Sequence, residues 1–283
     1  MDLCNLNEVL PLIERHGFRF SKALGQNFLT DAKIPRRIAE ASGAGAGCGV
    51  LEIGPGVGCL TRELALRADK VVSVELDDRL IPVLAETLAD LPNTKVINAD
   101  IMRTNVEKLV SEEFQGLTPL ICANLPYNIT TSVITMLLET GMFERFTVMI
   151  QKEAAVRLCA GPGDADYCAF SVISNFYTTP EILFDVPAGC FTPQPKVTSA
   201  VVHMERKADL AAKQEKLFLR VVRAAFAQRR KTLRNSLSSA MGDVRKEVLD
   251  ACMEECGIDP AVRGEALSVE EFAALADAIG AAK

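Results

Sequence analysis

The residue types best suited to chemistry stand in one short stretch, Asn124-Leu125-Pro126-Tyr127. The exocyclic amine of adenine is a poor nucleophile because its lone pair is delocalised into the ring. An Asn side-chain carbonyl and a neighbouring main-chain carbonyl can each accept one N–H, which aims the nitrogen lone pair at a methyl donor. Pro126 fixes the local backbone, and Tyr127 offers a ring on which an extruded base can stack. The pattern favours methyl transfer to a nucleobase; an ordinary turn is the alternative.

A methyl donor needs a pocket, and the residues from Val50 to Gly58 have the pattern of one. The apolar run over residues 48–53 is typical of a buried strand in a parallel sheet. Glycines follow at positions 54, 56 and 58, where a ligand can approach the main chain. A helix predicted over residues 59–67 completes a strand–turn–helix cradle of nucleotide size.

The glycine spacing distinguishes between nucleotide ligands. The dinucleotide fingerprint is Gly-x-Gly-x-x-Gly, whereas here the third glycine is Gly58 and Cys59 stands at the fingerprint position. This departure argues against NAD and suits a ligand with an adenosine but no pyrophosphate, such as S-adenosylmethionine. A glycine turn that only closes a strand–helix unit is the alternative.

Two acids follow predicted strands on the ligand side of the sheet. Glu75 ends the strand predicted over residues 70–75, where a carboxylate about 20 residues beyond the glycines can accept both ribose hydroxyls. Asp100 follows a third strand and can accept a hydrogen bond from the adenine amine, while Ile101 can pack on the ring. An exposed acid and a helix N-cap are the respective alternatives.

An alternation of strands and helices predicts the scaffold that positions these side chains. Strands are predicted near residues 50–53, 71–75, 95–98, 119–123, 147–151, 182–186 and 199–204, and helices over 5–15, 33–42, 59–67, 78–88, 106–113, 132–139 and 167–177. The alternation is typical of an α/β fold with a Rossmann-like, doubly wound sheet, mostly parallel and of seven strands. Its ligands should bind beyond the carboxyl ends of the strands.

Phe191 stands at the start of a proline-stiffened loop over residues 191–197. A phenylalanine in such a loop is not expected to lie wholly in the core. We expect it to close over the face of the base opposite Tyr127. A loop anchor packed on the domain is the alternative.

Helices replace the strand–helix alternation after Lys207, which predicts a methyltransferase-like domain over residues 1–207 and a smaller all-α domain over 208–283. The longest helix is predicted over residues 217–241 and ends before Gly242. Arg223, Arg230 and Arg234 share one face of this helix at helical spacing. Together with the neighbouring Arg229 and Lys231, they are candidate RNA phosphate contacts. A solvated helix face is the alternative.

Composition bounds the class of protein. The chain has 283 residues and a net charge of −6, so any nucleic-acid contact must use locally concentrated basic residues. It contains no apolar run near the roughly 18 residues of a membrane span and no signal-peptide pattern at its N-terminus. Nine cysteines without a C-x-x-C pair and only two histidines favour a reducing cytoplasm and no metal site.

Taken together, these residues resemble the small-subunit ribosomal RNA adenine dimethyltransferase family, which is associated with kasugamycin sensitivity. The resemblance covers nearly the whole chain and rests on residues 24–29, 52–56, 74–75, 98–100, 124–127, 151–153, 191–197 and 228–231. The chain departs from the family in its acidic net charge, in Ala23 and Leu24 where Lys or Arg is common, and in Cys168 where glycine is usual.

The resemblance implies a Rossmann-like class I methyltransferase that uses S-adenosylmethionine. It implies N6,N6-dimethylation of two adjacent adenosines near the 3′ end of 16S rRNA, within the immature small subunit, by a cytoplasmic monomer. The implied cofactor contacts are Asn27, Leu29, Gly54, Gly56, Glu75, Asp100, Ile101 and Asn124. The implied catalytic residues are Asn124, Leu125, Pro126, Tyr127 and Phe191, of which Tyr127 and Phe191 would flank the base.

Three other functions remain open from the sequence. One is a 23S rRNA adenine N6-methyltransferase of the macrolide-resistance type, against which the long helical C-terminal part argues. Another is an RNA-binding assembly factor without catalysis, which the intact Asn124–Tyr127 stretch and Glu75 disfavour. The third is an NAD-dependent enzyme, which Cys59 disfavours.

Overall fold

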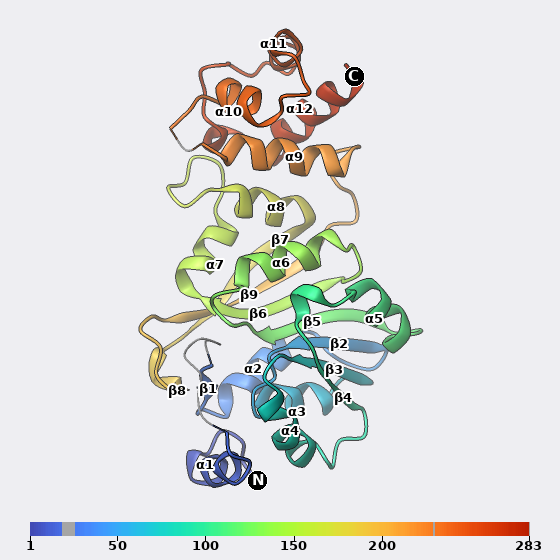
Figure 1. Ribbon diagram of the computed structural model, residues 1–283, viewed down its shortest axis with the longest axis vertical. Coiled ribbons are helices and arrows are strands. Elements are labelled where there is room, and N and C mark those ends of the chain that lie inside the picture. The colour runs from blue at the N-terminus through green and yellow to red at the C-terminus, as the bar shows by residue number, and fades with distance from the viewer. Residues whose placement is uncertain (19–25, 229, 283) are drawn as a thin grey trace. The chain divides into compact units, whose positions relative to one another are not determined.

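The computed structural model describes residues 1–18, 26–228 and 230–282 (Figure 1). The chain forms two compact units, and each is described by itself. The first comprises residues 1–155 and 181–206, and the second comprises residues 156–180 and 207–283. The later segment of the second unit begins at the predicted change of character near residue 207, and its earlier segment, residues 156–180, was not predicted. The functional domain limit between residues 207 and 208 stays a prediction.

A seven-stranded sheet organises the first unit, in the order β4-β3-β2-β5-β6-β9-β7. Its strands are β2 (Cys48–Ile53), β3 (Lys70–Glu75), β4 (Thr94–Asn98), β5 (Thr118–Asn124), β6 (Arg145–Gln151), β7 (Thr178–Val186) and β9 (Ser199–Arg206). Strands β2 to β6 pair in parallel, and β9 runs antiparallel to β6. The predicted seven-stranded, mostly parallel sheet is confirmed.

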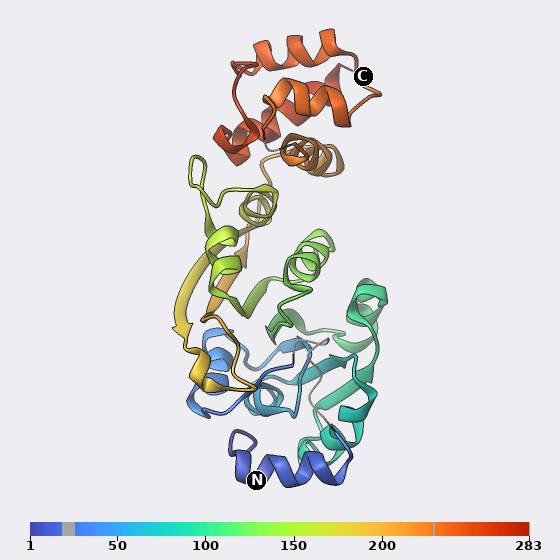
Figure 2. The ribbon, with the colours of Figure 1, turned by 60° about the vertical axis from the view of Figure 1, so that its left-hand side comes forward.

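Helices between the strands of the first unit cover its sheet (Figures 1 and 2). They are α2 (Lys33–Ala41), α3 (Cys59–Ala65), α4 (Ile81–Thr87), α5 (Val106–Glu113) and α6 (Thr130–Glu139). Helix α1 (Leu6–Arg15) precedes the strands and packs with α4 in one apolar cluster, and α7 (Lys152–Cys159) follows β6. Ile38 of α2 and Leu64 of α3 are fully buried in one cluster with Val50 and Val71 of the sheet. The apolar runs that predicted the strands therefore form the core under these two helices.

Local hydrogen bonds begin the helices where the sequence indicates. The Asn5 side chain accepts from the Asn7 amide at the start of α1. Asp31 Oδ1 accepts from the Lys33 amide at 3.0 Å, at the start of α2. Between β3 and α4 the chain makes a short 3₁₀ turn, η1 (Asp78–Leu80), so the predicted 78–88 helix is divided. Ionic and polar residues at these points satisfy amides that the first helical turn leaves unpaired.

The second unit is helical, with α8 (Ala169–Tyr177), α9 (Glu215–Phe226), α10 (Leu233–Ala240), α11 (Lys246–Glu255) and α12 (Val269–Ala281). An aromatic cluster forms its core. The ring of Phe176 on α8 stacks on Phe218 of α9 with centroids 4.0 Å apart. The ring of Phe226 contacts Tyr167 and Phe272 at centroid distances of 6.1 and 6.0 Å.

The predicted long helix over residues 217–241 is wrong. Helix α9 ends at Phe226 and α10 begins at Leu233, with Thr232 as an extended N-cap whose side chain accepts from the Asn235 amide. The residues between Ala227 and Leu233 are all polar, so a helix there would have no apolar side chain to bury. In addition, a Thr side chain competes for backbone amides. The common basic face is therefore lost, because Arg223 lies on α9 and Arg234 on α10.

No helix within the described residues is both long enough and apolar enough to cross a membrane.

Replacing the stacked Phe218 by alanine should strongly destabilise the second unit. The side chain of Phe218 is 0% exposed, and Phe→Ala in a core costs about 3–5 kcal/mol through lost burial and a residual cavity. We expect Phe218→Ala to lower the urea midpoint of the helical unit, followed by circular dichroism. Lys216→Ala is the control, since Lys216 is exposed on the same helix and should change stability by less than about 0.5 kcal/mol. Equal effects would contradict the assigned packing.

Candidate functional site

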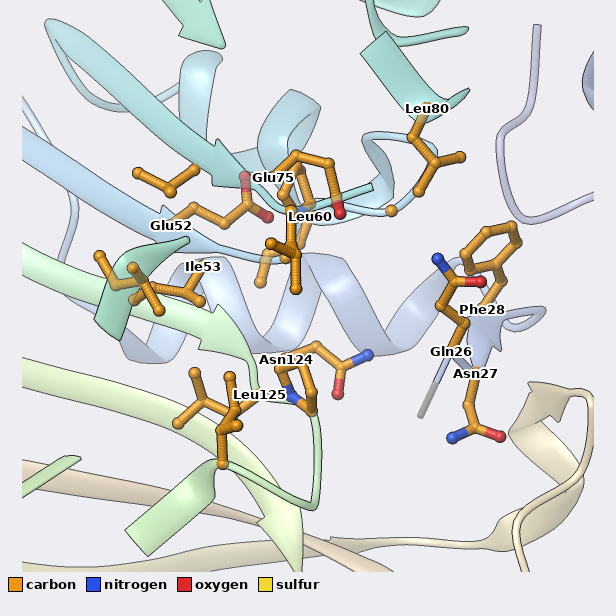
Figure 3. Close-up of a pocket in the computed structure, with 18 of the residues that line it drawn as sticks. Gln26, Asn27, Phe28, Glu52, Ile53, Leu60, Glu75, Leu80, Asn124 and Leu125 are labelled. Atoms are coloured by element: carbon orange, nitrogen blue, oxygen red, sulfur yellow. The ribbon is translucent and has the colours of Figure 1, made fainter. Parts of the chain in front are cut away.

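A pocket in the first unit opens at the carboxyl ends of β2, β3 and β5 (Figure 3). It is lined by residues 26–29, 52–57, 59–60, 74–76, 80, 99–101 and 124–129. In Figure 3 the Glu52 and Glu75 side chains lie on one side, Asn124 and Leu125 lie opposite, and Gln26, Asn27 and Phe28 lie on a third side. The location agrees with the rule that ligands of parallel sheets bind beyond the strand ends.

The pocket brings together nearly all of the residues predicted from the sequence. The predicted cofactor contacts that line it are Asn27, Leu29, Gly54, Gly56, Glu75, Asp100, Ile101 and Asn124. Leu125, Pro126 and Tyr127 line it as well. Phe191 does not belong to this lining within the part of the chain that the structure describes.

The glycine loop requires glycine for its backbone angles, and at position 56 also for space. Gly54 and Gly56 have φ of +69° and +62°, in the left-handed region that other residues rarely adopt. A Cβ on Gly54 would lie 3.6 Å from Pro126 Cδ, and one on Gly56 would lie 3.3 Å from the Phe28 ring. The loop thus stands against both the Asn124–Tyr127 corner and the segment that contains Asn27.

Glu75 ends β3 and is 6% exposed. Its Oε1 accepts from the Asp77 amide at 2.8 Å. Burial raises the pKa of this carboxyl, while hydrogen bonds from the amides of Asp77, Gly56 and Leu76 oppose the shift. The Gln26 side chain donates to Asp77 Oδ2 at 2.8 Å and so joins the N-terminal wall of the pocket to the end of β3.

Asp100 is the N-cap of a short helix and also lines the pocket, while its contact with an adenine amine stays a prediction. Its Oδ1 accepts from the Met102 amide at 2.9 Å and caps η2 (Ile101–Arg103). Its Oδ2 lies 3.5 Å from Arg103 Nε. Because the residue also lines the pocket, capping fixes the carboxylate at the pocket wall. Ile101 is 4% exposed and provides the apolar surface beside it.

The Asn124–Tyr127 corner is anchored by its backbone and by the tyrosine hydroxyl. The Leu125 amide donates to Met149 O at 3.1 Å, and Pro126 O accepts from the Thr130 hydroxyl at 3.1 Å. The Tyr127 hydroxyl and Ser199 Oγ are hydrogen-bonded at 2.7 Å, and burial raises the tyrosine pKa. The Asn124 side chain points into the cavity (Figure 3).

Phe191 is buried, with 3% exposure, in the same core cluster as Ile34 and Ile38. The expectation that this ring would not lie wholly in the core is wrong, and the structure shows the loop anchor. The cause is a pairing distant in sequence: β8 (Phe191–Thr192) runs antiparallel to β1 (Phe28–Leu29), with Phe191 opposite Leu29. Stacking of Phe191 on a base stays a prediction.

Sequence reasoning missed Glu52, which lines the pocket and is 1% exposed. Its Oε2 accepts from Thr61 Oγ1 at 2.6 Å and from Ser73 Oγ at 2.7 Å. Burial raises the pKa of Glu52 to about 7, the two hydroxyls oppose this, and the charge of Glu75 adds to it. An acid inside the apolar run Val50–Ile53 was the available signal, because buried carboxylates are rare without a function.

The basic residues predicted to contact RNA lie in the second unit, in different surroundings. Arg234 forms an ion pair with Asp250 at 2.5 Å, and Arg230 and Lys231 are exposed in the α9–α10 connection. Arg223 is exposed on α9, and Arg229 lies outside the described residues. Their role in RNA binding stays a prediction. Among the described residues, no group of three or more His, Cys, Asp or Glu is placed to hold a metal ion.

The sheet order, the glycine loop after β2 and the strand-end acids define a Rossmann-like, class I methyltransferase. Residues 17–280 match the family described as ribosomal RNA adenine dimethylase. The ribosomal RNA small subunit methyltransferases A of Bacillus cytotoxicus and Bacillus mycoides are each 45% identical over 98% of this chain and 97% of their own. The chain belongs to the ribosomal RNA adenine dimethylase family and is an enzyme, as the sequence predicted.

Solved structures agree on the fold. The 23S rRNA methyltransferase ErmE is 27% identical, with a TM-score of 0.65 over 89% of this chain and 99% of its own. A dimethyladenosine transferase from Plasmodium falciparum is 24% identical, with a TM-score of 0.75 over 88% of this chain and 95% of its own. The similarity to the Plasmodium falciparum enzyme shows a common fold.

The raised pKa of Glu52 makes stability depend on pH in a definite direction. The unfolded chain loses this proton near pH 4.5 and the native chain near 7, so a rising pH destabilises the native state between these values. The free energy of unfolding of Glu52→Gln should therefore rise relative to that of wild type between pH 5 and pH 8. The complete change, across both pKa values, is roughly 3 kcal/mol. Urea unfolding of both proteins at these pH values measures the difference between their free energies of unfolding. The contributions of other titrating groups are the same in both proteins and cancel in this difference. A pH-independent difference would contradict the assignment.

Proposed function

We propose that the chain transfers methyl groups from S-adenosylmethionine to N6 of two adjacent adenosines near the 3′ end of 16S rRNA, in the immature small ribosomal subunit. The approach of the glycine loop to the Asn124–Tyr127 corner carries the proposal. Since a Cβ on Gly54 would lie 3.6 Å from Pro126 Cδ, a cofactor on the loop and an amine at the corner would share one pocket. We expect the enzyme to act as a monomer in the cytoplasm.

The pocket has the hydrogen-bond acceptors that an adenosine cofactor requires. Glu75 would accept the ribose hydroxyls, Asp100 would accept the adenine amine, and Ile101 would pack on the ring. The bare backbone at Gly54 and Gly56 would admit the methionine part, with Asn27 and Leu29 at its border. When bound, S-adenosylmethionine supplies an electrophilic methyl group on a positively charged sulfur.

The Asn124–Tyr127 corner would prepare the nucleophile. The Asn124 side-chain carbonyl and a main-chain carbonyl would accept the two N–H groups of the target amine and withdraw its lone pair from the ring. Tyr127, tied to Ser199 at 2.7 Å, would hold the extruded base in that orientation. Positioning of this kind supplies much of a rate enhancement without covalent catalysis.

Small-subunit rRNA is favoured over large-subunit rRNA as the substrate. Relatives named as small subunit methyltransferases A are 45% identical over 98% of the chain, whereas the 23S rRNA enzyme ErmE is 27% identical over 89%. Methyl incorporation into under-methylated small and large subunits, with the modified positions mapped, tests the proposal. Incorporation only into the large subunit, or none into either, would overturn it.

Removal of the Asn124 carboxamide should abolish methyl transfer while cofactor binding survives. The carboxamide would act on the target amine, and the cofactor would keep its contacts with Glu75 and Asp100. We expect Asn124→Ala to lower turnover at least 100-fold, in the range lost with one oriented catalytic group, with cofactor affinity within about threefold by calorimetry. Asn7→Ala is the matched control, since Asn7 is exposed on α1. Normal turnover in Asn124→Ala would refute the assigned role.

Neutralising the α9–α10 connection should weaken RNA attachment through charge. Arg230 and Lys231 are exposed there, and each phosphate contact contributes about one to the slope of log Kobs against log salt concentration. We expect Arg230→Gln with Lys231→Gln to reduce that slope by roughly two for binding to under-methylated small subunits. Lys216→Gln, at an exposed position of α9, is the control. A slope equal to that of wild type would exclude these residues as phosphate contacts.

A further inference from the structure

The pocket is lined by acids and, among its described lining residues, by no Lys, Arg or His. The acids are Glu52, Glu75 and Asp100. Asp100 has a cation nearby, with Arg103 at 3.5 Å. No basic side chain of the described residues forms an ion pair with Glu52 or Glu75. The field in the pocket therefore favours a ligand that carries positive charge.

Glu52 is the most deeply buried of the three acids, at 1% exposure. Both of its hydroxyl donors, Thr61 at 2.6 Å and Ser73 at 2.7 Å, bind Oε2. It stands two residues before Gly54, on the strand that leads into the glycine loop. A neutral side chain would satisfy the same two donors, so packing gives no reason for a carboxylate at this position.

Methyl transfer changes the charge of the cofactor. The S–CH₃ bond breaks, its electron pair stays on sulfur, and a cationic sulfonium becomes a neutral thioether. The ammonium and carboxylate of the methionine part are unchanged. A fixed negative charge on a buried side chain of the pocket therefore distinguishes the fresh cofactor from the spent one.

We propose that Glu52 is a specificity-determining residue that favours the sulfonium cofactor over its thioether product. This inference rests on the proposed function, because it assumes that S-adenosylmethionine binds in this pocket. The preference promotes exchange of product for fresh cofactor between successive methylations. It differs from the expected tasks of Glu75 and Asp100, whose ribose and adenine partners are the same in both molecules.

The discrimination depends on pH through the ionisation of Glu52. The other titratable groups facing it are Glu75 from β3, Cys59 from α3 and Cys122 from β5. Hydrogen bonding with Cys4 and burial raise the pKa of Cys59, and burial raises the pKa of Cys122, so both thiols are neutral near pH 7. Since the pKa of Glu52 is about 7, a cationic ligand stabilises its charged form and releases a proton on binding.

Calorimetric titration with S-adenosylmethionine and S-adenosylhomocysteine tests the inference. At pH 8, Glu52→Gln should lower the affinity ratio of sulfonium to thioether roughly tenfold, as expected for one unit charge at a partly screened distance. At pH 6, where wild-type Glu52 is mostly protonated, the two proteins should differ much less. Glu107→Gln, an exposed acid of α5, should leave the ratio unchanged.

Wild-type protein supplies a second measurement that needs no variant to fold. Titrations at pH 7 in buffers of different ionisation enthalpy count the protons released, which should be more for the sulfonium than for the thioether. Equal proton release, or equal loss of both affinities in Glu52→Gln, would overturn the inference while leaving the proposed function intact. Failure of wild type to bind either molecule would instead overturn the proposed function, and the inference with it.

Discussion

The contact between the glycine loop and the Asn124–Tyr127 corner is the constraint on which the site depends. The loop follows β2 and the corner follows β5, and these strands pair in parallel with Leu51 opposite Ile121. This register brings both strand ends to the same edge of the sheet. A shift of the pairing would separate Gly54 from Pro126, and any other residue at position 54 would have to adopt a strained φ of +69° beside the proline ring. Glycine there therefore serves geometry and access at once.

The same edge of the sheet concentrates negative charge, and the fold supports that charge at a cost to stability. Glu75 is held by backbone amides, whereas Glu52 has two hydroxyls and a pKa of about 7. Hydroxyl donors compensate a buried carboxylate less fully than a cation would. An arrangement that costs native stability without an ion pair is typical of binding sites. The charge of the neighbouring Glu75 makes Glu52 harder still to ionise.

Local patterns predicted most of the scaffold and most of the pocket. Apolar runs marked the strands, glycines marked the loop, and acids at strand ends marked the pocket wall. Phe191 could not be placed this way, because its burial results from pairing with Leu29, far away in the chain. The break before Thr232 was missed because basic residues suit a helix surface and a connection equally well. Glu52 was overlooked because a single acid within an apolar run does not change the strand assignment.

With an acidic net charge of −6, the overall field of the protein does not attract a nucleic acid, and some of its cations are paired within the protein. Arg220 and Arg234 of the second unit form ion pairs with Asp243 and Asp250. Exposed pairs of this kind contribute little to stability. Within each pair, however, the negative charge cancels the electrostatic field of the cation beyond a short distance. Attraction of RNA would then depend on the cations outside such pairs, and the acidic pocket would repel phosphate. Such a distribution of charge would favour an uncharged base over the phosphate backbone in the pocket.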